Sequence, residues 1–140
     1  MSPFAHFLHT VRTRHGIRQT ELAEMMGYEQ TYISALEVGK KGPPTEAFIS
    51  RLITVLQFNP EECRELLEAA EASQRKLVIG IDENQDVYWM IKDLRDRLPE
   101  LTSAQIQLIR QILVLKESWV QPPINRAYLP KRHRNQEAKM

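Results

Sequence analysis

The stretch from Gln19 to Glu37, QTELAEMMGYEQTYISALE, contains two short segments that carry apolar residues at helical spacing. The residues on these apolar faces are Leu22, Ala23 and Met26 in the first segment, and Ile33 and Leu36 in the second. Gly27 separates the two segments. A glycine between helices this short favours a left-handed residue at the end of the first one, because it has no Cβ to clash. The pattern therefore predicts two helices joined by a tight turn.

The second segment of this pair has a polar outer face. Gln30, Thr31 and Ser34 point away from the apolar face when residues 29–37 are drawn as a helix. Two helices that meet at a steep angle, the second with a polar outer face, form a helix-turn-helix motif. The second helix of such a motif fits the major groove of double-stranded DNA. Sequence-specific DNA binding is therefore the leading hypothesis.

Other residues of the amino-terminal half also fit a recognisable family pattern. The residues concerned are Arg12, Gly16, the run Gln19–Ala23, Gly27, Ile33, Ser34, Glu37, Gly39, Pro43, Leu52 and Leu56. With them, the stretch from Phe7 to about Leu56 resembles the Xre family of helix-turn-helix transcriptional regulators, whose members include the lambda-type phage repressors. The resemblance covers roughly one third of the chain. It implies an all-α, five-helix lambda-repressor-like domain.

The resemblance also implies that two glutamines contact DNA. Gln30 lies at the start of the second helix of the motif, residues 29–37, which is the recognition helix of these regulators. Its position is the one that reads an adenine in the family. Its amide can pair with both N6 and N7 of that base. Gln19 matches the residue that contacts a phosphate and braces the first glutamine. The alternative for Gln30 is a solvated residue on a helix surface.

Five other side chains of this region are predicted to contact DNA. Thr31 and Ser34 have short hydroxyl side chains that reach base edges or phosphates, and Tyr32 can lie flat against the sugar-phosphate backbone. Lys40 and Lys41 follow the recognition helix in a glycine-flanked loop, where their ammonium groups can bind phosphates. Simple exposure to solvent is the alternative for each of them.

Arg12 and Glu37 occupy positions that form an internal ion pair between the first and third helices in many members of the family. Their expected role is to orient the two helices. We therefore do not count either residue among those that read bases.

Five helices are expected in residues 1–75, around a single core. The first begins at Pro3 and is ended by Gly16, and the fourth is capped by Thr45. The run Asn59–Glu62 supplies the cap, the first-turn proline and the acids of a helix start. It opens a fifth helix that is expected to extend to about residue 73.

Cys63, in this fifth helix, is the single cysteine of the chain. It lies in line with Leu66, Leu67 and Ala70 at helical spacing, so we expect a buried structural thiol. One cysteine cannot form an internal disulfide, which is typical of a protein of the reducing cytoplasm.

Residues 76–119 are expected to form a second unit, a helical hairpin. The apolar run LVIGI, Leu77–Ile81, predicts either a brief strand or a buried linker. One helix is expected from Asp86 to Leu98, and a capping box at Thr102–Gln105 opens another. Both carry more apolar surface than a hairpin buries by itself. We therefore expect them to dock on the fifth helix, to pair with a second copy, or both.

Residues 120–140 form a basic, proline-containing tail that we expect to be extended or disordered. Residues 118–140 carry five lysines and arginines against one acid, although the net charge of the whole chain is only +1. Lys131, Arg132 and Arg134 have the alternative role of an arm in the minor groove. With so little net charge, binding to DNA should be modest in affinity and strongly salt-dependent.

Several classes of protein do not fit the sequence. No apolar run approaches the roughly 20 residues of a membrane helix. We find no nucleophile with its base and no phosphate-cradling glycine loop, so we expect neither an enzyme nor a bound cofactor. His6 and His9 lack further metal ligands, and Asp82, Glu83 and Asp86 lack the rest of a calcium loop.

Three functional hypotheses remain open. The first is a dimeric repressor, because one recognition helix touches only about four or five base pairs and specificity takes two copies. Residues 86–119 are then the expected dimer interface. The second is an antitoxin-like DNA-binding protein that sequesters a protein partner through its carboxy-terminal segment. The third is an interaction module whose helix-turn-helix has lost contact with DNA.

Overall fold

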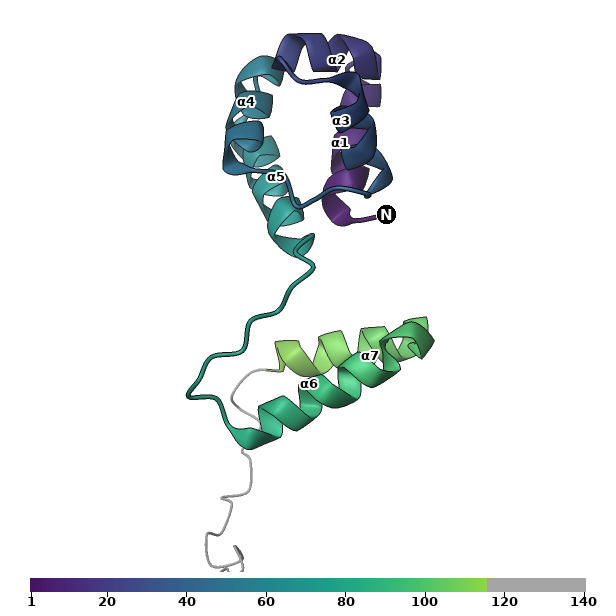
Figure 1. The fold of residues 1–140 in the computed structure, drawn as a ribbon, viewed down its shortest axis with the longest axis vertical. Coiled ribbons are helices and arrows are strands. Elements are labelled where there is room, and N and C mark those ends of the chain that lie inside the picture. The colour runs from purple at the N-terminus through teal and green to yellow at the C-terminus, as the bar shows by residue number, and fades with distance from the viewer. Residues whose placement is uncertain (116–140) are drawn as a thin grey trace, which may run out of the picture. The chain divides into compact units, whose positions relative to one another are not determined.

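The computed structural model describes residues 1–115, which contain seven α-helices, one short 3₁₀ helix and no strand. The fold of the described residues is therefore all-α, as predicted. The chain divides into two compact units, Met1–Ile79 and a second unit that begins at Gly80 (Figure 1). The predicted basic tail, residues 120–140, and the last residues of the predicted hairpin lie outside the described part of the chain.

The first unit contains five helices, which are labelled in Figure 1. They are α1 (Pro3–Arg14), α2 (Gln19–Met26), α3 (Gln30–Val38), α4 (Glu46–Leu56) and α5 (Pro60–Ala72). Each lies close to its predicted place. Helix α3 begins and ends one residue later than the predicted range 29–37, because Glu29 is the residue that precedes the helix as its N-cap.

Local hydrogen bonds explain where these helices begin. The hydroxyl of Thr45 accepts a bond from the amide of Phe48 at 3.2 Å and caps α4. Asn59 and Glu62 form a reciprocal capping box at the start of α5, with bonds of 2.8 and 3.2 Å. Pro60 is the first residue of α5, where a missing amide proton costs no hydrogen bond. The predicted start signals of α4 and α5 are confirmed.

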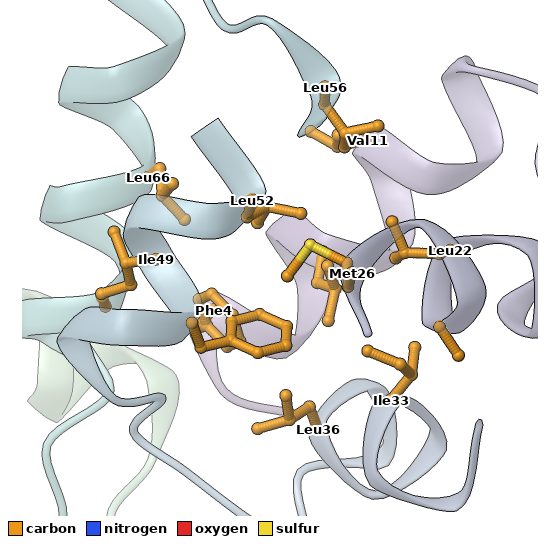
Figure 2. Close-up of a cluster of buried hydrophobic side chains, with 14 residues drawn as sticks. Phe4, Val11, Leu22, Met26, Ile33, Leu36, Ile49, Leu52, Leu56 and Leu66 are labelled. Carbon is orange, nitrogen blue, oxygen red and sulfur yellow. The ribbon is translucent and has the colours of Figure 1, made fainter. Parts of the chain in front are cut away.

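One apolar core lies between the five helices (Figure 2). Its largest fully buried side chains are Phe4, Leu8, Val11, Leu22, Met26, Ile33, Leu36, Phe48, Leu52 and Leu66. Burying each side chain of this size contributes about 1.5–3 kcal/mol to folding. The core therefore fixes the positions of α2 and α3, because the apolar face of each helix is inside it.

The prediction of a buried Cys63 is only partly right. The thiol is half-buried, and its Sγ lies 3.9 Å from the carbonyl oxygen of Phe58. Helix α5 packs through Leu66 and Ala70, which are buried, whereas Leu67 is 53% exposed. Adjacent positions of a helix are about 100° apart, so the buried stripe is too narrow to include Leu67.

The segment between the two units is neither of the predicted alternatives. Residues 77–81 form no strand, and the side chains of Leu77, Val78 and Ile81 are exposed. A strand requires a partner strand for its backbone hydrogen bonds, and the described residues provide none. The prediction of a buried linker was therefore wrong for these three residues.

The second unit contains α6 (Gln85–Arg97), the 3₁₀ helix η1 (Leu98–Glu100) and α7 (Ser103–Val114). Pro99 interrupts the helical run, and the predicted capping box of Thr102 and Gln105 opens α7. No residue of α6 or α7 is buried. Their large exposed apolar side chains are Tyr88, Trp89, Met90, Ile106, Leu108, Ile112, Leu113 and Val114. Within residues 1–115, no helix is long and apolar enough to cross a membrane.

Candidate nucleic-acid interface

The turn between α2 and α3 has the geometry that the sequence predicts. Gly27 ends α2 with φ at +71°, in the left-handed region, and the amide of Tyr28 donates to the carbonyl oxygen of Ala23 at 3.0 Å. Leu22 and Ile33 are fully buried on the two sides of the turn. The two helices are therefore held against each other by the core, with the opposite face of α3 left outward.

The predicted reading residues of α3 lie on this outward face. The side chains of Gln30 and Thr31 are exposed, and that of Ser34 is half-exposed. The hydroxyl of Thr31 lies 3.4 Å from a carboxylate oxygen of Glu29, a long hydrogen bond that a ligand can replace. The structure thus brings these three polar side chains together at the surface.

Gln19 connects α2 to both ends of α3. Its Oε1 accepts a bond of 3.2 Å from Nε2 of Gln30, and its own Nε2 donates to Oε2 of Glu37 at 2.9 Å. The amide of Gln19 is therefore oriented by the carboxylate and in turn orients the amide of Gln30. The predicted bracing of one glutamine by the other is confirmed.

Glu37 is the anchor of this chain of hydrogen bonds, with only 4% of its surface exposed. Arg12 binds it with two bonds, from Nε at 2.5 Å and from Nη2 at 3.1 Å. A third nitrogen of the same guanidinium donates to the carbonyl oxygen of Ile17 at 2.9 Å. The predicted ion pair between α1 and α3 is confirmed, and it adds a contact to the loop before α2.

The protonation of this pair follows from its surroundings. Burial raises the pKa of Glu37, but the hydrogen bonds from Arg12, Gln19 and His9 together outweigh it, so the pKa lies below its ordinary value. The bond to Glu37 raises the pKa of Arg12. Both groups are therefore charged at neutral pH, and the carboxylate acts as a hydrogen-bond acceptor for its neighbours.

Tyr32 is held by the core. Its ring stacks on Tyr28, with centroids 5.3 Å apart, and meets Phe48 edge-on at 5.7 Å. Burial raises the pKa of its hydroxyl. The ammonium of Lys41 lies 5.3 Å from the centre of the Tyr32 ring, within range of a cation–π interaction. Only part of Tyr32 therefore remains available to a ligand.

Lys40 and Lys41 lie in the loop that follows α3, and both are exposed. Gly39, with φ at +84°, ends the helix. The backbone amides of both lysines donate to the carbonyl oxygen of Ala35, at 3.0 and 3.2 Å. The backbone of this loop is therefore tied to the last turn of α3, and no acid occurs between Val38 and Thr45.

Two cations near the motif were not among the predicted DNA-binding residues. Arg75, beyond the end of α5, donates from its guanidinium to the carbonyl oxygen of Gly39. Arg51 of α4 lies beside the turn, since a Cβ added to Gly27 would be 3.6 Å from its Nη2. Neither residue belongs to a periodic pattern or to the Xre resemblance. Only the folding of α4 and α5 around the motif brings them near it.

The comparisons with known proteins agree with this description of the first unit. Residues 3–67 match the family model of a helix-turn-helix domain. The match begins at the first residue of α1 and ends within α5. Searches of the curated proteins and of the solved structures gave no significant match. Residues 3–67 are therefore similar to a helix-turn-helix domain in sequence, and their helices have the arrangement that such a domain requires.

Proposed function

We propose that the protein is a sequence-specific, DNA-binding regulator of transcription that reads the major groove with α3. The observation that carries the proposal is the chain of bonds from Arg12 through Glu37 and Gln19 to Gln30. It holds an exposed amide in a defined orientation at the start of α3. Because the bond to Gln19 orders the side chain of Gln30 before DNA binds, less conformational entropy has to be lost on binding.

The orientation of Gln30 leaves the correct groups for an adenine. One N–H of its amide is used by Gln19, and the second N–H and the oxygen remain. The oxygen can accept from N6 of the base and the N–H can donate to N7. Thr31 and Ser34 are near enough along α3 to contact neighbouring base edges or phosphates.

Lys40 and Lys41, in the acid-free loop after α3, supply the proposed phosphate contacts. We propose that polar contacts with the sugar-phosphate backbone of DNA also come from Gln19, at the start of α2, and from the exposed part of Tyr32. These contacts fix the register of the protein on the duplex, whereas α3 supplies the sequence preference.

We propose further that two copies bind together. A single recognition helix reads too few base pairs for high specificity. Helices α6 and α7 expose large apolar side chains, including Trp89, Ile112 and Leu113, that a second copy would cover. A dimer bound at a promoter can block access of the transcription machinery by steric overlap, so we propose a repressor. We place this regulator in the cytoplasm and assign it no catalytic activity of its own.

The same exposed apolar face favours a second candidate function. A different protein could cover α6 and α7, in which case the chain is an antitoxin-like DNA-binding protein that sequesters a partner. The mass of the purified protein in solution separates the two candidates. A dimer supports self-association, and a monomer leaves the face free for another protein.

A salt titration tests the proposed function itself. Binding of the purified protein to random duplex DNA should weaken steeply as salt rises, because each phosphate contact releases counterions. The Lys40→Ala/Lys41→Ala variant should reduce the slope by about two units, at roughly 0.9 per lost contact. A wild-type protein whose binding shows no salt slope makes no phosphate contacts and would contradict the proposal.

A further inference from the structure

We propose that Arg75 is a positioning residue of the DNA-binding surface, which fixes the loop that carries Lys40 and Lys41. The inference rests on the proposed function, because it assigns a role in binding phosphates to that loop. Arg75 lies 36 residues from Gly39 in sequence, after α5 has ended. The residues that shape the DNA-binding surface would then include one that follows α5.

The chain after α5 is directed towards the end of α3 by a buried contact. The hydroxyl of Ser73 is buried, accepts a bond of 2.8 Å from the amide of Phe4 and donates to the carbonyl oxygen of Ala69 at 2.7 Å. The bond from Phe4 joins the chain to the start of α1, two residues before Arg75, and the bond to Ala69 ties the same hydroxyl to the last turn of α5. A Cβ on Gly39 would be 3.9 Å from the amide nitrogen of Ser2, so the start of α1 also lies beside the end of α3 (Figure 1).

The position that Arg75 occupies favours a cation. The last carbonyl groups of a helix have no partner inside it, and the partial negative charge of the helix dipole is concentrated there. The guanidinium donates to the carbonyl oxygen of Gly39, the residue that directly follows the last turn of α3, and so lies close to this negative end of the helix. A hydrogen bond from a charged donor is stronger than one between neutral groups.

Arg75 completes the restraint of the loop. The amides of Lys40 and Lys41 are bonded to Ala35, and the carbonyl of Gly39 is bonded to Arg75, so the peptide group that precedes Lys40 is held on both sides. Gly39 and Gly42 flank the two lysines, and glycines allow many conformations when no contact restrains them. Loss of Arg75 should therefore spread the two ammonium groups over many positions and weaken their contacts with phosphates.

A double-mutant cycle tests the inference. Arg75→Ala, Lys40→Ala/Lys41→Ala and the triple variant are compared for affinity to random duplex DNA, with Lys76→Ala as the matched control. Lys76 is an adjacent, exposed cation, so its removal changes the charge equally. We expect Arg75→Ala to lose affinity about fivefold and Lys76→Ala by less than about twofold, at one moderate salt concentration. In the background without the two lysines, Arg75→Ala should have no further effect, because residues that act through each other are not additive.

Amide hydrogen exchange supplies a readout that does not depend on DNA. The amides of Lys40 and Lys41 should exchange faster in Arg75→Ala than in the wild type, and at the wild-type rate in Lys76→Ala. An equal loss of affinity with and without the lysines, or equal effects of Arg75→Ala and Lys76→Ala, would overturn the inference. Unchanged exchange in Arg75→Ala would also overturn it. A wild-type protein that binds no duplex would instead contradict the proposed function.

Discussion

Nε2 of Gln19 lies 2.9 Å from Oε2 of Glu37, so the first residue of α2 is bonded to the last turn of α3. The same carboxylate is bonded to Arg12 of α1. Three helices therefore meet at one buried anion. The amide of Gln30 is the exposed end of this arrangement. We therefore expect both the stability of the domain and its proposed reading of DNA to depend on the carboxylate of Glu37.

Glu37→Ala should destabilise the first unit by about 3 kcal/mol, because it leaves Arg12 with only 15% of its side chain exposed and without its partner. Denaturant unfolding measures the loss. Glu29→Ala is the control, since Glu29 is an exposed acid at the opposite end of the same helix, makes no capping bond through its side chain, and should change stability by less than about 0.5 kcal/mol. Equal losses in the two variants would contradict a structural role for the ion pair.

The contribution of Glu37 should disappear in acid. Its pKa is lower in the folded than in the unfolded protein, where it is about 4.3, so ionisation stabilises the folded state. This stability is fully present above the unfolded pKa and is lost as pH falls through the lower, folded value. The difference in unfolding free energy between wild type and Glu37→Gln should therefore shrink below about pH 4. A difference that stays constant from neutral pH into this range would be inconsistent with the lowered pKa.

Ile112→Asp should convert the proposed dimer into monomers and weaken operator binding. Ile112 is 64% exposed on α7, and a carboxylate there would have to lose its hydration in an apolar interface. Gln111→Asp introduces the same charge at the neighbouring exposed position and serves as the control. Sedimentation measures the mass of each variant. If Ile112→Asp remains dimeric, the second copy binds elsewhere.

Much of the first unit could be predicted from the sequence, because its signals are local. The spacing of Leu22, Met26 and Ile33, the turn at Gly27 and the cap at Thr45 each concern residues within one or two turns of a helix. The pairing of Arg12 with Glu37, and that of Gln19 with Gln30, came from the family resemblance rather than from any local pattern. Both are present in the structure.

The features that sequence reasoning missed depend on tertiary contacts. Arg75 reaches Gly39 only because α5 returns the chain to the start of α1, which no local pattern indicates. The ring of Tyr32 was expected on the DNA backbone, but the core supplies two aromatic rings for it to pack against. Leu67 and the run from Leu77 are apolar yet exposed, and hydropathy alone does not distinguish a core residue from an exposed one.

The selection of bound fragments from a random pool of duplex DNA, with wild type and Gln30→Ala in parallel, tests the central claim most directly. We predict that the wild type enriches a site of two symmetric half-sites. We also predict that Gln30→Ala loses roughly 1–3 kcal/mol and relaxes the preference at one position of each half-site. Failure of the wild type to enrich any sequence would contradict the claim that α3 reads DNA. Uniform weakening by Gln30→Ala across all sequences would contradict the role of Gln30 in reading a base.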